Sequence, residues 1–352
     1  MVVYLIMLAI SLFFASCAGR IRDIQECRRS YRVFAVLSFL PFFLVSAIRY
    51  EVGTDWSIYE EYFYAINNGT NKFKEPIFNL LNRLIYLFSK DAQLLFVVVA
   101  ALSLGFAFCA IYKQSKYIPF SILLYFLSTN YFNSLNQLRQ SLAMSIFLFA
   151  TQYIEKRDWK KYFFWMIVAV GIHMSAIVYI PLYFLYHWKV SIKEHLLLFL
   201  AVLVGMPVLK VLIIKIVSLT PYAWYFESMF GENDFLLAGF AVSFLILVFH
   251  EYYKYIQEHE DDKMYSFMVN VQWLCVVSLL CTGFIPQVSR ISTAFEVISI
   301  LSIPRMILKE EKRNRRIVMY CIVVLLLLIR LLYYVYICGF FWVVPYKTIF
   351  SC

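Results

Sequence analysis

The sequence predicts an all-α membrane protein, a polytopic bundle of transmembrane helices, and its composition and apolar patterning indicate this fold class. Hydrophobic residues make up 62% of the 352 positions, whereas charged residues make up only 15%. A soluble domain carries about 25% charged residues. The apolar residues also gather into runs that approach the roughly 20 residues a helix needs to cross a bilayer. We therefore expect residues 1–352 to form a single integral membrane domain.

The apolar runs predict about twelve spans. The pair 162–173 and 174–187 is also compatible with one span followed by an interfacial segment. The predicted spans cover residues 1–19, 33–48, 92–112, 118–132, 138–154, 162–173, 174–187, 196–216, 236–250, 265–283, 291–308 and 317–337.

Lysine and arginine predict the orientation of these spans. Six connecting segments hold 20 of the 32 basic residues, and cytoplasmic loops are the ones enriched in lysine and arginine. The N-terminus, the loop 49–91 and the tail after about residue 338 are then expected outside. The six basic segments are 20–32, 113–117, 155–161, 188–195, 251–264 and 308–316.

Two outer loops are long enough to contribute to a site. Loop 49–91 has apolar residues at helical spacing, such as Tyr59 and Phe63, and predicts two amphipathic helices on the outer face. Loop 217–235 combines aromatic residues with carboxylates, as at Trp224 and Glu227. That combination suits sugar stacking and also suits an interfacial aromatic belt.

Several classes of function find no support in the sequence. The net charge of +10 falls mostly in short loops, so we expect no nucleic-acid partner. The eight cysteines form no C-x-x-C pair, and no nucleotide-binding or H-E-x-x-H motif is present. No D-x-D doublet stands in an outer loop, so we expect neither a metal nor a cofactor.

Arginines at the edges of apolar runs are the main functional signal. A charge near hydrocarbon costs roughly 2.5–3.5 kcal/mol at a helix centre, so such a residue is a candidate for function. Arg49, Arg139 and Arg290 all fall on the expected outer side beside polar clusters. Arg330 lies inside the last span without a local polar cluster, which sets it apart from the other three.

The segments around Arg49 and Arg139 suggest an anion site with a base. Arg49 can bind phosphate oxygens through two N–H groups, or can simply snorkel at a helix end. Asp55, six residues later, can act as a base or hold a sugar hydroxyl. On a continuous helix, Asn136, Arg139 and Gln140 would share one face, which predicts a wet, polar cavity.

Two further residues complete the candidate site. His173 lies near the outer end of an apolar run and can transfer protons near neutral pH, although a lone histidine is more often structural. Arg290 opens a later span at the same outer level, within Pro286-Gln287-Val288-Ser289-Arg290.

Together these stretches resemble the EpsG family, which is related in role to Wzy polysaccharide polymerases. The resemblance rests on Arg49-Tyr50-x-x-Gly53-Thr54-Asp55-x-x-x-Tyr59, on Glu75-Pro76-Ile77-Phe78-Asn79-Leu80-Leu81, on Tyr131 to Ala143 and on His173-Met174-Ser175-Ala176. Beyond about residue 190 the resemblance is limited to the hydropathy pattern and to Arg290.

The resemblance implies polymerisation of oligosaccharide repeat units carried on undecaprenyl pyrophosphate. The site would face the periplasm or exterior of a bacterial cytoplasmic membrane, with membrane lipid around it and a chain-length regulator as an expected partner. Asp55 and His173 are the candidate catalytic residues, and Arg49, Asn136, Arg139, Gln140 and Arg290 the candidate substrate-binding residues. Two rival functions are a transporter or flippase of lipid-linked oligosaccharide and an acyltransferase or ligase.

Overall fold

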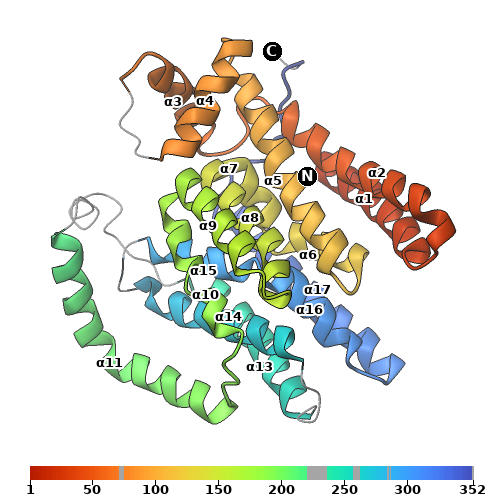
Figure 1. Ribbon diagram of the computed structural model, residues 1–352, viewed down its shortest axis with the longest axis vertical. Coiled ribbons are helices and arrows are strands. Elements are labelled where there is room, and N and C mark those ends of the chain that lie inside the picture. Colours follow the sequence, from red (N-terminus) through yellow and green to blue (C-terminus); the bar gives the residue numbers. More distant parts are fainter. Residues whose placement is uncertain (71–74, 220–235, 257–261, 284, 286, 351–352) are drawn as a thin grey trace. The chain divides into compact units, whose positions relative to one another are not determined.

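The computed structural model describes residues 1–70, 75–219, 236–256, 262–283, 285 and 287–350. In these residues the regular structure is helical, as predicted, with one isolated β-bridge between Arg49 and Thr348 (Figure 1). The chain forms two compact units, Met1–Ile180 with Glu310–Cys352, and Pro181–Lys309. The predicted outer loop 217–235 lies almost entirely outside the described residues.

Fewer helices than predicted are long enough to be spans. Within the described residues, seven helices are long and apolar enough to cross a membrane, or eight if the bent pair α15–α16 is one span. The predicted count of about twelve is therefore not confirmed, since several predicted spans are short helices or pairs of broken ones. The seven are Val2–Ile21, Gln25–Ala47, Gln93–Gln114, Ile192–Ile216, Leu237–Tyr255, Lys263–Gly283 and Arg313–Ile337.

The first unit is a helical bundle built from the two ends of the chain. Its first two helices, α1 and α2, pack side by side, because the turn between them is short. Its helices are α1 (Val2–Ile21), α2 (Arg28–Ala47), α3 (Trp56–Asn67), α4 (Pro76–Phe88), α5 (Gln93–Gln114), α6 (Ile118–Leu127), α7 (Asn130–Asn136), α8 (Leu138–Glu155), α9 (Trp159–Ile172) and α17 (Arg313–Leu332).

The region between α6 and α8 is a broken helix. Thr129, with φ +67°, lies directly before α7 and separates it from α6, and Gln137, with ψ +64°, separates α7 from α8. The prediction that Asn136, Arg139 and Gln140 share one face of one helix is therefore wrong, because Asn136 belongs to α7. Breaking the helix lets these polar groups bond to different neighbours.

Arg330 has a structural position near this break. Its side chain is buried, and its Nη2 donates to the carbonyl of Ser128 at 3.3 Å, directly after the last residue of α6. A cation at that end of α6 also suits the negative end of the helix dipole. The structure thus supports the separation of Arg330 from the other three arginines.

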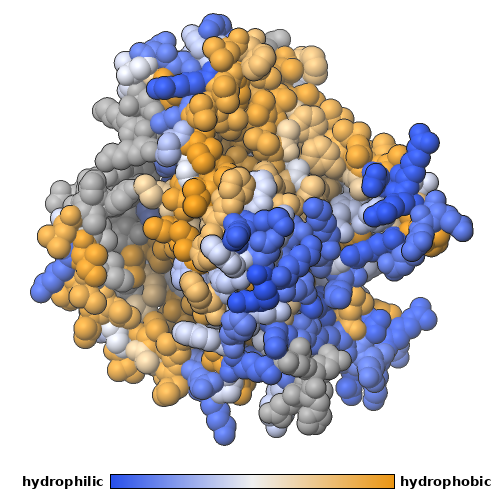
Figure 2. Space-filling model, viewed as in Figure 1, coloured by the Kyte–Doolittle hydropathy of each residue, from blue (hydrophilic) through white to orange (hydrophobic). Residues whose placement is uncertain are grey.

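Basic segments of the first unit meet at one end of the bundle. At one end Arg22, after α1, donates to the Ser115 carbonyl at 2.7 Å, and the ring of Tyr117 lies 6.0 Å from that of Tyr320 near the start of α17. Figure 2 shows hydrophilic residues gathered at the turn between α1 and α2. At the other end, Tyr4 of α1 donates to the Val343 carbonyl at 3.0 Å. The basic turns therefore share one end, as their predicted cytoplasmic location requires.

The second unit has its core on α14 (Lys263–Leu280), which is mostly buried. One end holds buried ionic groups. Glu251 accepts from the indole N–H of Trp273 at 2.6 Å and lies 3.0 Å from Nδ1 of His195. The other helices of this unit are α10 (Leu182–Leu185), α11 (Ile192–Ser218), α13 (Leu237–Ile256), α15 (Val288–Glu296) and α16 (Ser299–Leu308).

Candidate functional site

Arg49 lies in the loop between α2 and α3, residues 48–55, which we call the Arg49 loop. Only 2% of Arg49 is exposed, and its Nη1 donates to the carbonyl of Val52 at 3.0 Å and to that of Leu135. Its guanidinium lies 5.2 Å from the ring centre of Phe96 on α5. Burial lowers the pKa of Arg49 to about 10, so the group stays charged at neutral pH.

Gly53 and Thr54 join the Arg49 loop to α7. Gly53 has φ +110°, and a Cβ there would lie 2.8 Å from the Leu135 carbonyl oxygen, so the close approach needs glycine. Asn136 Oδ1 accepts from the Thr54 backbone N–H at 2.5 Å and from its hydroxyl at 2.9 Å. The predicted polar residue Asn136 therefore fixes the loop that carries Arg49 and Asp55.

The C-terminal segment, residues 339–350, packs onto the Arg49 loop. The Tyr346 hydroxyl adds a bond of 2.7 Å to the Val45 carbonyl of α2. Both segments were predicted outside, and their contact agrees with a shared side. The backbone bonds run from Tyr50 N–H to the Lys347 carbonyl (3.1 Å), from Ile349 N–H to the Ile48 carbonyl (3.0 Å) and from Gly53 N–H to the Trp342 carbonyl (3.1 Å).

Glu75, Arg139 and His173 form a second group, which we call the Glu75 cluster. Oε1 of Glu75, directly before α4, lies 3.0 Å from Nη1 of Arg139 on α8 and 3.9 Å from Nδ1 of His173 after α9. The three side chains are only 11–14% exposed. A carboxylate beside both a histidine and a guanidinium can orient the imidazole for proton transfer.

Tyr59 links the Glu75 cluster to Asp55. Tyr59 lies on α3 one turn after Asp55, and its backbone N–H bonds to the Asp55 carbonyl at 3.0 Å. Burial raises the pKa of the Tyr59 phenol, nearby Arg139 lowers it through charge and a hydrogen bond, and Asp55 raises it. Tyr59 therefore stays protonated at neutral pH and interacts with both Arg139 and Asp55.

Close packing of α4 on α9 holds the cluster together. A Cβ at Gly171 would lie 2.6 Å from Cγ1 and Cδ1 of Ile77, so the absence of a side chain lets α4 approach α9. Ile77 is two residues after Glu75, and Gly171 is two residues before His173. The glycine thereby helps bring the side chains of Glu75 and His173 together.

The structure brings together five of the seven predicted site residues. Arg49, Asp55, Asn136, Arg139 and His173 all belong to the first unit, at the end opposite the basic turns.

Two predicted residues take other positions. Gln140 is buried on α8, directly after Arg139, and Arg290 is half-buried on α15 of the second unit. Glu75 and Tyr59 were not predicted as site residues. Both stand in the motifs that carry the family resemblance, but no pattern of spacing placed them beside Arg139.

The helices that are long and apolar enough to cross a membrane define the class of this protein as a multi-pass membrane protein. Its sequence matches the model of the EpsG family over residues 32–348, nearly the whole chain. The chain therefore belongs to the EpsG family, a Wzy-like polymerase family, and is a polysaccharide polymerase-like membrane protein. No curated protein and no solved structure matches it.

Proposed function

We propose that the chain is a glycosyltransferase that joins oligosaccharide repeat units carried on undecaprenyl pyrophosphate into a surface polysaccharide, such as an O-antigen, a capsule or an exopolysaccharide. The site would face the outer side of a bacterial cytoplasmic membrane. Family membership supports the polymerase class. The observation that carries the chemistry is the Glu75 cluster, which places a histidine, a carboxylate and an arginine within one small region.

The proposed reaction needs a base and a cation. A hydroxyl oxygen of the incoming repeat unit attacks the anomeric carbon of the growing chain. The bond from that carbon to the pyrophosphate oxygen breaks, and undecaprenyl pyrophosphate leaves with the electron pair. The hydroxyl proton passes to the base. A guanidinium that faces the leaving oxygen stabilises the developing negative charge without a metal.

We assign the base to His173 and the cation to Arg139. A pyrophosphate oxygen competes with Glu75 as an acceptor for Arg139, since a guanidinium binds phosphate in the same planar geometry as a carboxylate. When phosphate binds Arg139, the Glu75 carboxylate is free to accept the Nδ1–H of His173, which lies 3.9 Å away in the structure. Nε2 of His173 then takes the hydroxyl proton.

Arg49 has a different proposed role. Its Nη1 already binds two carbonyl oxygens, and the residue is almost fully buried. We therefore assign Arg49 a structural role. It holds the loop that carries Asp55 and does not contact pyrophosphate directly. Asp55 remains the alternative base. That Asn136, Gln140 and Arg290 contact the sugar or pyrophosphate stays a prediction from the sequence.

The test is polymerisation by purified protein supplied with a defined lipid-linked repeat unit, followed by gel separation of the products. The native chain should give a ladder. His173→Gln should lower the rate about 10²–10⁴-fold, the range of a lost general base. Asp55→Asn should retain most activity if His173 is the base, and the reverse pattern would move that role to Asp55.

The same assay separates the polymerase from its rival. A flippase would move unaltered lipid-linked oligosaccharide across a bilayer and would give no ladder. Arg330, Lys210 and Lys215 inside apolar runs favour a transport path in the sequence. The structure gives a partner to the first of them, since Arg330 bonds to the Ser128 carbonyl. Transport without polymer formation would overturn the proposed function.

A further inference from the structure

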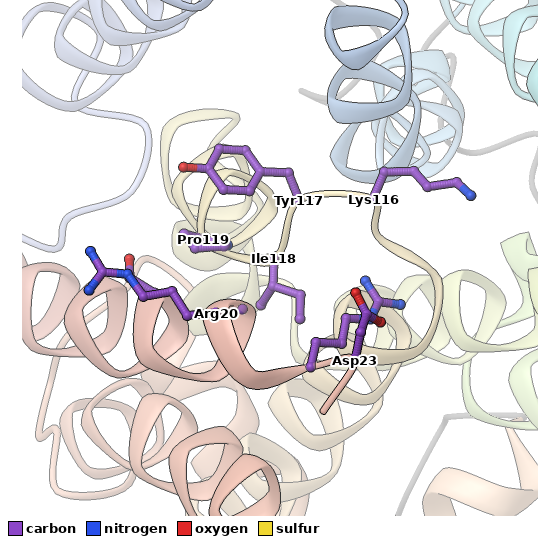
Figure 3. Close-up of a pocket in the computed structure, with 9 residues that line it drawn as sticks. Arg20, Asp23, Lys116, Tyr117, Ile118 and Pro119 are labelled. Atoms are coloured by element: carbon purple, nitrogen blue, oxygen red, sulfur yellow. The ribbon is translucent and has the colours of Figure 1, made fainter. Parts of the chain in front are cut away.

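A second polar site lies at the opposite end of the first unit from the Glu75 cluster. A pocket of about 630 Å³ opens between the end of α1 and the turn from α5 to α6 (Figure 3). Its lining includes three cations, Arg20, Arg22 and Lys116, and one carboxylate, Asp23. Three positive charges against one negative charge give the lining a net charge of +2, which suits an anion.

The two walls of the pocket are tied together. Arg22 Nη1 donates to the Ser115 carbonyl at 2.7 Å, which joins the end of α1 to the turn before α6. Ser115 is fully buried, and its hydroxyl is 2.7 Å from that of Ser121 on α6. The pocket is therefore part of the packed bundle, and Arg20 and Lys116 stand on different walls of it (Figure 3).

The surface that leads to the pocket is apolar and exposed. Ile6 is 55% exposed and Phe13 is 64% exposed, and with Arg20 they recur at intervals of seven residues along α1. Positions seven apart lie on the same side of a helix. An acyl chain lying along this side of α1 would place its head group at Arg20, where the apolar helix ends.

From the charge of the pocket and the apolar side of α1, we propose that the pocket binds an anionic glycerophospholipid of the leaflet that meets the basic turns. The phosphodiester lies among the pocket cations Arg20, Arg22 and Lys116, and the acyl chains lie along α1. Basic pockets between transmembrane helices on the cytoplasmic side bind anionic head groups in this way. The site does not depend on the proposed polymerase activity, and the apolar side of α1 favours a lipid over a soluble phosphate.

The test uses native mass spectrometry of the purified full chain, with phosphatidylglycerol as the probe. The double variant Arg20→Gln/Lys116→Gln removes two pocket cations and leaves the Arg22 bond intact. The matched control, Lys156→Gln/Lys160→Gln, removes two exposed cations from the basic turn between α8 and α9. We expect the pocket variant to bind phosphatidylglycerol about tenfold or more weakly, and the control to bind like the native chain.

Three outcomes would overturn the proposal. If both variants bound phosphatidylglycerol equally weakly, the lipid would be attracted by the overall positive charge of the surface and not by the pocket. If the native chain retained phosphatidylcholine as well as phosphatidylglycerol, the pocket would not select for the head-group charge. Displacement of phosphatidylglycerol by glycerol 3-phosphate at similar concentration would assign the pocket to a soluble phosphate. Thermal unfolding of each variant checks that the bundle is intact.

Discussion

Arg49 and Arg139 illustrate how two arginines in similar sequence contexts have different surroundings. Both stand beside polar residues next to apolar runs, and both were predicted to bind pyrophosphate. Arg49 is 2% exposed and bonds to backbone carbonyls, whereas the Arg139 side chain is 14% exposed and pairs with Glu75. The sequence could not separate these roles, because they depend on the carbonyl of Leu135 and on the position of Glu75.

Substituting the two arginines should have different consequences. Arg49→Ala leaves two carbonyls without their donor, so we expect a loss of about 3 kcal/mol in unfolding free energy and a poorly folded protein. Arg139→Gln keeps a hydrogen-bond donor for the largely buried Glu75 carboxylate, so it should lower the thermal midpoint less than Arg49→Ala does, and it should abolish the polymer ladder. Arg83→Ala, an exposed arginine on α4, is the control and should change neither measurement. A folded, active Arg139→Gln protein would contradict the assignment.

Gly53 is the most restrictive single position in the site. Gly53→Ala must accept φ +110° and a contact of 2.8 Å with the Leu135 oxygen, so we expect destabilisation of roughly 2 kcal/mol or more. Gly105→Ala on α5 is the control, since a Cβ there meets no atom within 4 Å. Denaturant unfolding of the two variants measures the difference. Equal stability of both would mean that the loop relaxes without cost.

At the scale of elements, helix positions were more predictable than helix breaks. Apolar residues at helical spacing, such as Tyr59 and Phe63, predicted helices in loop 49–91, and α3 buries both. The break at Gln137 was missed because the spacing of its polar neighbours is compatible with one face of a continuous helix and also with two separate helices. The Glu75 cluster was missed because it depends on α4 packing against α9, between residues about a hundred positions apart.

The C-terminal segment should support the site from a distance. Truncation after Cys338 removes the backbone bonds to the Arg49 loop, so we expect the polymer yield to fall severalfold while the protein still inserts in the membrane. Two point variants refine the test. Tyr346→Phe, which loses the bond to Val45, should destabilise by about 0.5–1.5 kcal/mol.

Lys347→Ala is the matched control for this segment. The ion pair of Lys347 with Glu51 is half exposed on both sides, and such pairs contribute about 0–1 kcal/mol. Thermal unfolding and the product ladder measure both effects. Full activity of the truncated chain would show that the Arg49 loop holds its shape without the segment.

At the scale of the whole molecule, the sidedness of the chain links its fold to its function. The sequence predicted that the basic turns lie inside and that the Arg49 loop and the C-terminus lie outside. In the first unit the basic turns gather at one end, and the Arg49 loop and the C-terminal segment meet at the other. The orientation was predicted from the count of basic residues in the loops, whereas the arrangement of the two ends comes from the packing of the helices. The two observations are therefore independent and agree.

Reporter fusions test this orientation directly. Alkaline phosphatase is active only outside the cytoplasmic membrane, whereas green fluorescent protein becomes fluorescent inside. A fusion after Cys352 should therefore give active phosphatase and no fluorescence, and fusions of truncated chains after Lys116 or Lys160 should give the reverse, since basic loops stay in the cytoplasm. Fluorescence of the C-terminal fusion would place the Glu75 cluster on the cytoplasmic side. The proposed function requires polymerisation on the outer side, so this result would contradict it.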